Sequence, residues 1–187
     1  QGFDRFFGYN CQRQAHTFYP AYLYDDDRRL PLDNPPFPAH QKLPDGSDPD
    51  DPRSYAGYAG RVYAPDLIWE RARAFVRDNR DRPFFLYLPT TVPHLALQVP
   101  EDSLAEYRGR WPDPPYRGAR SYLPHPSPRA AYAAMVTRMD REVGRILDLL
   151  REQGLDERTI VVFTSDNGPT YDRIGGSDSE FFRSAGP

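Results

Sequence analysis

The sequence predicts an α/β fold in which a mostly parallel sheet is flanked by helices. Two continuous apolar runs, over residues 84–88 and 159–165, are typical of strands that are covered on both faces of a parallel sheet. Each run follows a stretch with apolar residues at helical spacing, over residues 65–79 and 129–153. This order of helix, strand, long loop, helix and strand indicates βαβ units with right-handed crossovers.

The remaining segments are assigned in chain order. Residues 1–24 are aromatic and irregular, and we expect short strand or loop pieces that pack on a larger body. Residues 25–60 are acidic and rich in Pro and Gly, and residues 108–128 are rich in Pro, so both are predicted to be surface loops. Pro65 is a favourable first-turn residue for one helix, and Gly154 is a suitable C-cap for the other.

Composition excludes several classes of protein. The chain has 187 residues and a formal net charge of -3, which gives no indication of a nucleic-acid partner. No apolar run approaches the length of a membrane span. The single cysteine, Cys11, excludes an internal disulfide and is expected to be a small packed residue. Because Gln1 is not an initiating methionine, we expect a processed chain or a fragment.

A candidate site lies where the two predicted strands end. Asp166 and Asn167 follow the second strand directly and offer the hard oxygen ligands that Ca²⁺ and Mg²⁺ take. His94 follows the first strand closely, and the carboxyl ends of parallel strands share one edge of the sheet. Taken alone, Asp-Asn-Gly is a common turn sequence, and His94 could equally be a surface loop histidine.

The other histidines carry less information. His125 lies in the second Pro-rich loop and could approach the site from above, and His16 could line the same region. His40 lies in the acidic stretch and is expected to be solvated.

An ordered series of motifs resembles the middle of a sulfatase of the arylsulfatase type, in the alkaline-phosphatase-like superfamily. The resemblance covers nearly the whole chain and is specific because the motifs occur in order. They are Gly2-Phe3-Asp4-Arg5-Phe6-Phe7-Gly8-Tyr9, Gln12-Arg13-Gln14-Ala15-His16, Arg82-Pro83-Phe84-Phe85-Leu86-Tyr87-Leu88, Pro93-His94, and Ile160-Val161-Val162-Phe163-Thr164-Ser165-Asp166-Asn167-Gly168.

The resemblance implies a role for three residues. Asp166 and Asn167 match the family's metal-binding pair, which holds Ca²⁺ in most members, and His94 matches a histidine that contacts the sulfate ester. In such hydrolases a formylglycine hydrate attacks sulfur and expels the alcohol, while the metal and cationic side chains stabilise the sulfate oxygens.

The chain also lacks several motifs of the family. The nucleophile motif, Cys or Ser followed by x-Pro-Ser-Arg, is absent, and Cys11 does not match it. The early pair of Asp metal ligands is also absent. The active-site lysines are absent too, because the only lysine, Lys42, lies in a variable loop. We therefore expect residues 1–187 to be the central part of a sulfatase catalytic domain, with formylglycine upstream. Alone, this incomplete fragment is predicted to be inactive, to bind Ca²⁺ weakly and to self-associate through exposed sheet edges.

Two alternatives remain at this point. One is a phosphodiesterase or phosphonate hydrolase of the same superfamily, and the other is a non-catalytic binding module. The substrate is expected to be a small-molecule or glycan sulfate ester, but the sequence does not identify it. The strong preference for Arg over Lys is typical of a GC-rich, bacterial genome, and many bacterial relatives are periplasmic or secreted.

Overall fold

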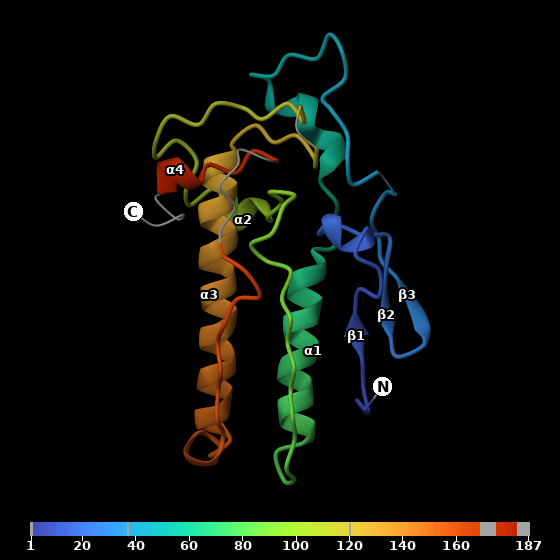
Figure 1. Ribbon diagram of the computed structural model, residues 1–187, viewed down its shortest axis with the longest axis vertical. Coiled ribbons are helices and arrows are strands. Elements are labelled where there is room, and N and C mark those ends of the chain that lie inside the picture. Colours follow the sequence, from blue (N-terminus) through green and yellow to red (C-terminus); the bar gives the residue numbers. More distant parts are fainter. Residues whose placement is uncertain (1, 37, 120, 169–174, 183–187) are drawn as a thin grey trace.

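The structure is a computed structural model that describes residues 2–36, 38–119, 121–168 and 175–182. Its two long helices are α1, Ala64–Asp78, and α3, Pro128–Glu152. They pack against each other, and a small sheet lies beside α1 (Figure 1). Two single-turn helices, α2 over Glu101–Leu104 and α4 over Ser179–Phe182, complete the α-helices of the described residues.

The small sheet is antiparallel. It contains β1, Phe7–Gly8, β2, Tyr22–Asp25, and β3, Arg28–Pro31, in that order. Three 3-10 helices, at Gln14–His16, Pro52–Tyr58 and Asp156–Arg158, interrupt the connecting segments. This antiparallel sheet is not the parallel sheet predicted from the sequence. The parallel sheet was predicted for residues 84–88 and 159–165, and none of β1, β2 and β3 belongs to those segments.

The two long helices confirm the prediction from apolar periodicity within a residue at each end. The predicted C-cap of α3 is also confirmed, because Gly154 has a positive φ of 63°. The backbone N–H of Gly154 donates to Arg151 O at 3.0 Å, and that of Leu155 donates to Leu150 O at 2.8 Å. This is a Schellman motif, and Leu155 and Leu150 complete it by packing in the same apolar cluster.

The core is divided into two clusters along the helices. The larger surrounds the N-terminal half of α3, where Ala131, Ala134 and Met135 are fully buried against Phe18 and Leu97. The smaller lies at the other end of the helices and contains the buried residues Val76, Leu149, Leu150 and Leu155. The site residues lie on loops that leave these two clusters.

Residues 84–88 and 159–165 differ from the prediction of buried strands. Both segments are extended and run in the same direction, each back along the helix before it (Figure 1). However, neither joins a β-ladder within the described residues, and their side chains are not covered on both faces. Phe85 is 72% exposed and Val162 is 79% exposed. The expected burial is wrong for this chain because no neighbouring strand among the described residues covers them.

In the part of the chain that the structure describes, no helix is long and apolar enough to cross a membrane.

Candidate functional site

His94 lies on the loop that follows the first extended segment. Its backbone N–H donates to Thr91 O at 2.8 Å, which forms a tight turn, and its ring Nδ1 lies 2.5 Å from Leu95 O. The ring is exposed and stacks on His16, with centroids 5.6 Å apart and an interplanar angle of 11°. His94 is therefore held in one orientation by its own loop and by a neighbouring imidazole.

His40 joins the same group, which we call the histidine cluster: His16, His40, His94 and Tyr122. His40 Nε2 lies 2.8 Å from His16 Nδ1, and His40 Nδ1 lies 2.6 Å from Ser121 Oγ. The Tyr122 ring packs on all three imidazoles at centroid distances from 4.9 to 5.7 Å. The cluster thus joins four segments that are far apart in the sequence.

The backbone at the base of the cluster adopts an unusual conformation. Ser121 and Tyr122 are consecutive non-glycine residues with positive φ values of 71° and 60°. Such residues are uncommon, and they persist where the surrounding structure fixes them, as it does at ligand sites. Here the conformation directs the Ser121 hydroxyl and the Tyr122 N–H to His40 Nδ1.

The cluster also affects proton binding. Burial lowers the pKa of His16 below its ordinary value, and positive charge on His40 and His94 would lower it further. His16 is thereby kept neutral over more of the range below pH 7. The expectation that His40 is solvated was incomplete: its ring is exposed but hydrogen-bonded on both nitrogens. Nothing in the sequence around His40 indicates these partners.

Asp166 and Asn167 lie side by side after the second extended segment, and both are exposed. The Asn167 N–H donates to Asp166 Oδ1 at 2.9 Å, and Asn167 Nδ2 donates to Gly168 O at 3.1 Å. Within the described residues their hydrogen bonds stay in the same loop, so no direct bond links them to His94. The structure therefore groups His94 with other histidines rather than with the oxygen pair.

The donor chemistry of this pair fits a hard cation, although two residues supply only part of a coordination sphere. Asp166 Oδ2 and Asn167 Oδ1 accept no hydrogen bond among the described residues. Ca²⁺ takes six to eight oxygen ligands, so further ligands would have to come from elsewhere. Consistent with this, no group of three or more His, Cys, Asp or Glu side chains arranged to hold a metal occurs in residues 2–36, 38–119, 121–168 or 175–182.

Two other candidate residues lie apart from the cluster. Cys11 is exposed, so the expectation that it is packed was wrong; it lies on an irregular loop before the first 3-10 helix. His125 pairs through its backbone with Tyr116, and its Nδ1 accepts from the Ser127 N–H at 3.0 Å. Burial lowers the pKa of His125 to about 4, which keeps the ring neutral at physiological pH.

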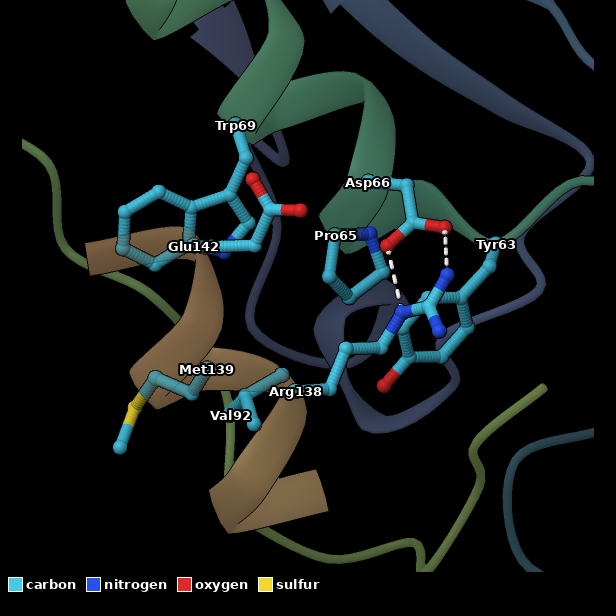
Figure 2. Close-up of a pocket in the computed structure, with 8 residues that line it drawn as sticks. All are labelled: Tyr63, Pro65, Asp66, Trp69, Val92, Arg138, Met139 and Glu142. Atoms are coloured by element: carbon cyan, nitrogen blue, oxygen red, sulfur yellow. Dashed lines mark hydrogen bonds and ion pairs between the residues drawn. The ribbon is translucent and has the colours of Figure 1, made fainter. Parts of the chain in front are cut away.

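A cavity between α1 and α3 is structural rather than ligand-binding. Arg138 crosses it to form a bidentate ion pair with Asp66, with Nε–Oδ1 and Nη2–Oδ2 distances of 2.8 and 2.6 Å (Figure 2). The space that remains is about 10 Å³, at the lower limit for a single water molecule. Glu142, which is 4% exposed, pairs with Arg73 across the same helix interface. These pairs fix the relative positions of α1 and α3, and each helix is followed in the chain by one of the extended segments that lead to the site loops.

Comparison with known proteins gives a consistent result. The chain matches the Sulfatase family model over residues 1–183. It is 35% identical over 172 residues to the uncharacterized sulfatase YdeN of Escherichia coli, with 92% of this chain and 24% of that protein covered. It is 34% identical over 137 residues to mouse steryl-sulfatase, with 70% of this chain and 18% of that protein covered.

An arylsulfatase of Klebsiella aerogenes is 28% identical over 145 residues, with 59% of this chain and 30% of that protein covered. The chain thus spans less than a third of the length of each of these relatives. The family match covers almost every residue, including the motifs that hold His94, Asp166 and Asn167. The chain therefore belongs to the sulfatase family.

Proposed function

We propose that the natural protein that contains this chain hydrolyses sulfate esters, and that residues 1–187 form the central part of its catalytic domain. The observation that carries the proposal is the Sulfatase match over residues 1–183. Relatives named as steryl-sulfatase, arylsulfatase and N-acetylgalactosamine-6-O-sulfatase support a sulfate ester over a phosphate ester. The alcohol part of the substrate is left open because the names of these relatives include sterol and sugar derivatives.

His94 is assigned to the sulfate ester. Its ring is exposed, and its Nδ1 is already engaged with the Leu95 carbonyl, so Nε2 is the atom available to the substrate. A protonated Nε2 donates a charge-assisted hydrogen bond to a sulfate oxygen, which is stronger than a neutral one. The stacked ring of His16 restricts the orientation of His94 and so favours this single direction of approach.

Asp166 and Asn167 are assigned to a divalent cation, with Ca²⁺ as the proposed ion. Asp166 Oδ2 and Asn167 Oδ1 would be two of its oxygen ligands. When bound, such an ion stabilises negative charge on the sulfate oxygens as a Lewis acid. The formylglycine nucleophile is expected in the part of the protein that precedes this chain, since no residue here matches its motif.

The two extended segments are assigned to strands of a parallel sheet that other parts of the protein complete. They run in the same direction, and their exposed apolar residues, including Phe85 and Val162, are suited to burial in a sheet (Figure 1). In the isolated 187-residue chain, the same open strand edges would instead favour self-association. Residues 25–60 contain β3 and a 3-10 helix, so only their irregular parts remain assigned to surface loops, together with residues 108–128. Substrate selectivity is expected in these loops.

The test is to purify the natural protein that contains this chain and to compare three substrates: 4-nitrophenyl sulfate, 4-nitrophenyl phosphate and a 4-nitrophenyl phosphonate. We expect the highest kcat/KM for the sulfate. A preference for either phosphorus ester would replace the proposal with a phosphodiesterase or phosphonate hydrolase. No turnover of any ester would support a non-catalytic binding module.

The role of His94 is tested by His94→Gln in the same protein. We expect kcat/KM for 4-nitrophenyl sulfate to fall by roughly 100-fold, the scale for losing one preorganised donor to a developing anion. Lys42→Gln is the matched control because it removes a cation from an exposed loop outside the cluster, and it should keep wild-type activity. Wild-type kcat/KM in a folded His94→Gln protein would remove His94 from the site.

A further inference from the structure

The hydrogen bonds of the histidine cluster determine where its protons lie. The backbone N–H of Tyr122 points at His40 Nδ1 at 3.2 Å, and a backbone N–H can only donate. His40 Nδ1 is therefore an acceptor, and neutral His40 carries its hydrogen on Nε2. That hydrogen is donated to His16 Nδ1 at 2.8 Å, so neutral His16 carries its own hydrogen on Nε2.

His94 has the opposite tautomer. Its Nδ1 lies 2.5 Å from the carbonyl oxygen of Leu95, which can only accept, so Nδ1 carries the hydrogen. In neutral His94, Nε2 is therefore a bare acceptor. His94 can take up a proton on Nε2 and keep its hydrogen bond to Leu95. His16 and His40 cannot be protonated without the loss of a hydrogen bond, because the Nδ1 atom of each is already an acceptor.

The cluster also lacks a counterion of its own. Within the described residues, the hydrogen-bond and ring-contact partners of its three imidazoles are one another, Ser121, Tyr122 and a backbone carbonyl. No carboxylate is among them. A proton taken up by His94 therefore leaves an exposed positive charge on the ring that stacks on His16, an arrangement that favours an external anion.

We propose that His16, His40 and His94 form one proton-coupled oxyanion site, in which His94 takes up a proton as the anion binds and His16 supplies a second, neutral N–H donor. His40 is the positioning residue: it contacts no anion itself but fixes the tautomer that presents His16 Nε2–H. The anion is a sulfate group or a chemically similar oxyanion. This inference rests on the proposed function for the identity of the anion and adds His16 and His40 to it.

Two further observations support the assignment. The lowered pKa of His16 keeps this ring neutral beside a protonated neighbour, as the second donor requires. The positive φ values of Ser121 and Tyr122 position the two groups that hold His40, and such strain is retained where a precise arrangement is needed. Together they indicate that the tautomer of His40 is set by the fold rather than by solvent.

The experiment is isothermal titration of inorganic sulfate into the natural protein that contains this chain, at pH 6 and pH 8. Repeating each titration in buffers of different ionisation enthalpy gives the number of protons taken up. We expect tighter binding at pH 6 and an uptake of up to one proton per sulfate in the wild type. His94→Gln should abolish both the proton uptake and the pH dependence.

His40→Leu distinguishes a positioning role from simple loss of structure, because leucine has a similar size but no hydrogen-bond donor. Without the His40 Nε2–H donor, His16 Nδ1 is free to be protonated. We therefore expect proton uptake to rise above the wild-type value, while the affinity at pH 8 falls about fivefold, the scale of one lost hydrogen bond. Lys42→Gln is again the matched control and should keep the wild-type uptake. Unchanged uptake and affinity in a folded His40→Leu protein would overturn the proposal.

The two proposals can fail separately. If the protein hydrolyses sulfate esters while His40→Leu binds sulfate as the wild type does, the proton-coupled site is wrong and the proposed function stands. If the wild type takes up sulfate together with a proton but hydrolyses no sulfate ester, the proposed function is wrong and the oxyanion site stands.

Discussion

The two strand-and-loop units of this chain, residues 84–94 and 159–167, share the pattern of an apolar run followed by a polar loop but have different environments. In the first unit Phe84 and Leu86 pack on the smaller apolar cluster while Phe85 and Tyr87 face outward. In the second unit residues 160–163 are all more than half exposed.

The loops at the ends of the two units differ in the same way. His94 contacts residues from two other segments, His16 and Tyr122, whereas the hydrogen bonds of Asp166 and Asn167 remain local. The histidine end of the site is thus organised by this chain alone. If Asp166 and Asn167 bind Ca²⁺ as proposed, the remaining ligands have to come from outside the described residues, because two residues supply only part of its coordination sphere.

The largest expected effect comes from Asp166→Ala in the natural protein that contains this chain. Loss of a metal ligand should lower kcat/KM for 4-nitrophenyl sulfate on the order of 10³-fold, because the charge of the transition state loses its stabilisation. Metal analysis of the purified protein should show less bound Ca²⁺. Asp81→Ala is the matched control, since Asp81 is an aspartate far from Asp166 in the sequence and its side chain is 88% exposed.

If the Asp166→Ala protein keeps its full Ca²⁺ content, Asp166 is not a metal ligand and the proposed difference between the two units is wrong. Conversely, the isolated 187-residue chain should bind Ca²⁺ only weakly and should not turn over an aryl sulfate. Turnover by that chain would mean that the oxygen end needs no further ligands and that the nucleophile lies within these residues.

A second prediction concerns the exposed face of residues 159–163. In the isolated chain Val162→Lys should change the free energy of unfolding by less than about 0.5 kcal/mol, because the side chain is exposed. In the natural protein it should cost about 3 kcal/mol, because an unpaired charge would be buried in the completed sheet. Urea denaturation measures both values, and sedimentation should show less self-association of the isolated variant.

Phe84→Ala is the comparison variant for this test. Phe84 packs on the smaller apolar cluster in the chain itself, so its loss should cost about 2 kcal/mol in both contexts. A cost below about 0.5 kcal/mol for Val162→Lys in the natural protein would contradict the assignment of this segment to a covered strand.

Local signals in the sequence predicted the local structure well. Apolar periodicity located α1 and α3, and Gly154 located the end of α3, because these features depend on neighbours within a few residues. The predicted burial of residues 159–165 was wrong because no neighbouring strand covers them within the described residues. The apolar character of this run predicts a preference for burial, but only the assembled sheet can provide it.

For the candidate site too, the sequence identified individual residues but not their distant partners. The oxygen pair and His94 were identified from their position after predicted strands, and their roles remain predictions. The partners of His94 could not be identified, because His16 and His40 are brought to it by contacts across more than 50 residues of sequence. Nor does any local pattern indicate the positive φ values of Ser121 and Tyr122 that hold His40.

The smallest effect concerns His125, the one histidine outside the cluster. Burial lowers its pKa to about 4, while an unfolded chain titrates near 6.5. Between these values the unfolded state binds a proton that the folded state does not, so stability is complete above about pH 6.5 and falls as the pH drops towards 4.

The expected loss of stability is roughly 2.5 kcal/mol between pH 6.5 and 4, and it is measured by urea denaturation across that range. His125→Gln should remove this component, whereas His40→Gln should keep it because His40 is exposed. Equal pH dependence in the wild type and His125→Gln would mean that His125 is not held neutral by burial. If the component is removed as expected, the pH dependence of folding is assigned to His125, and that of sulfate binding is left to the histidine cluster.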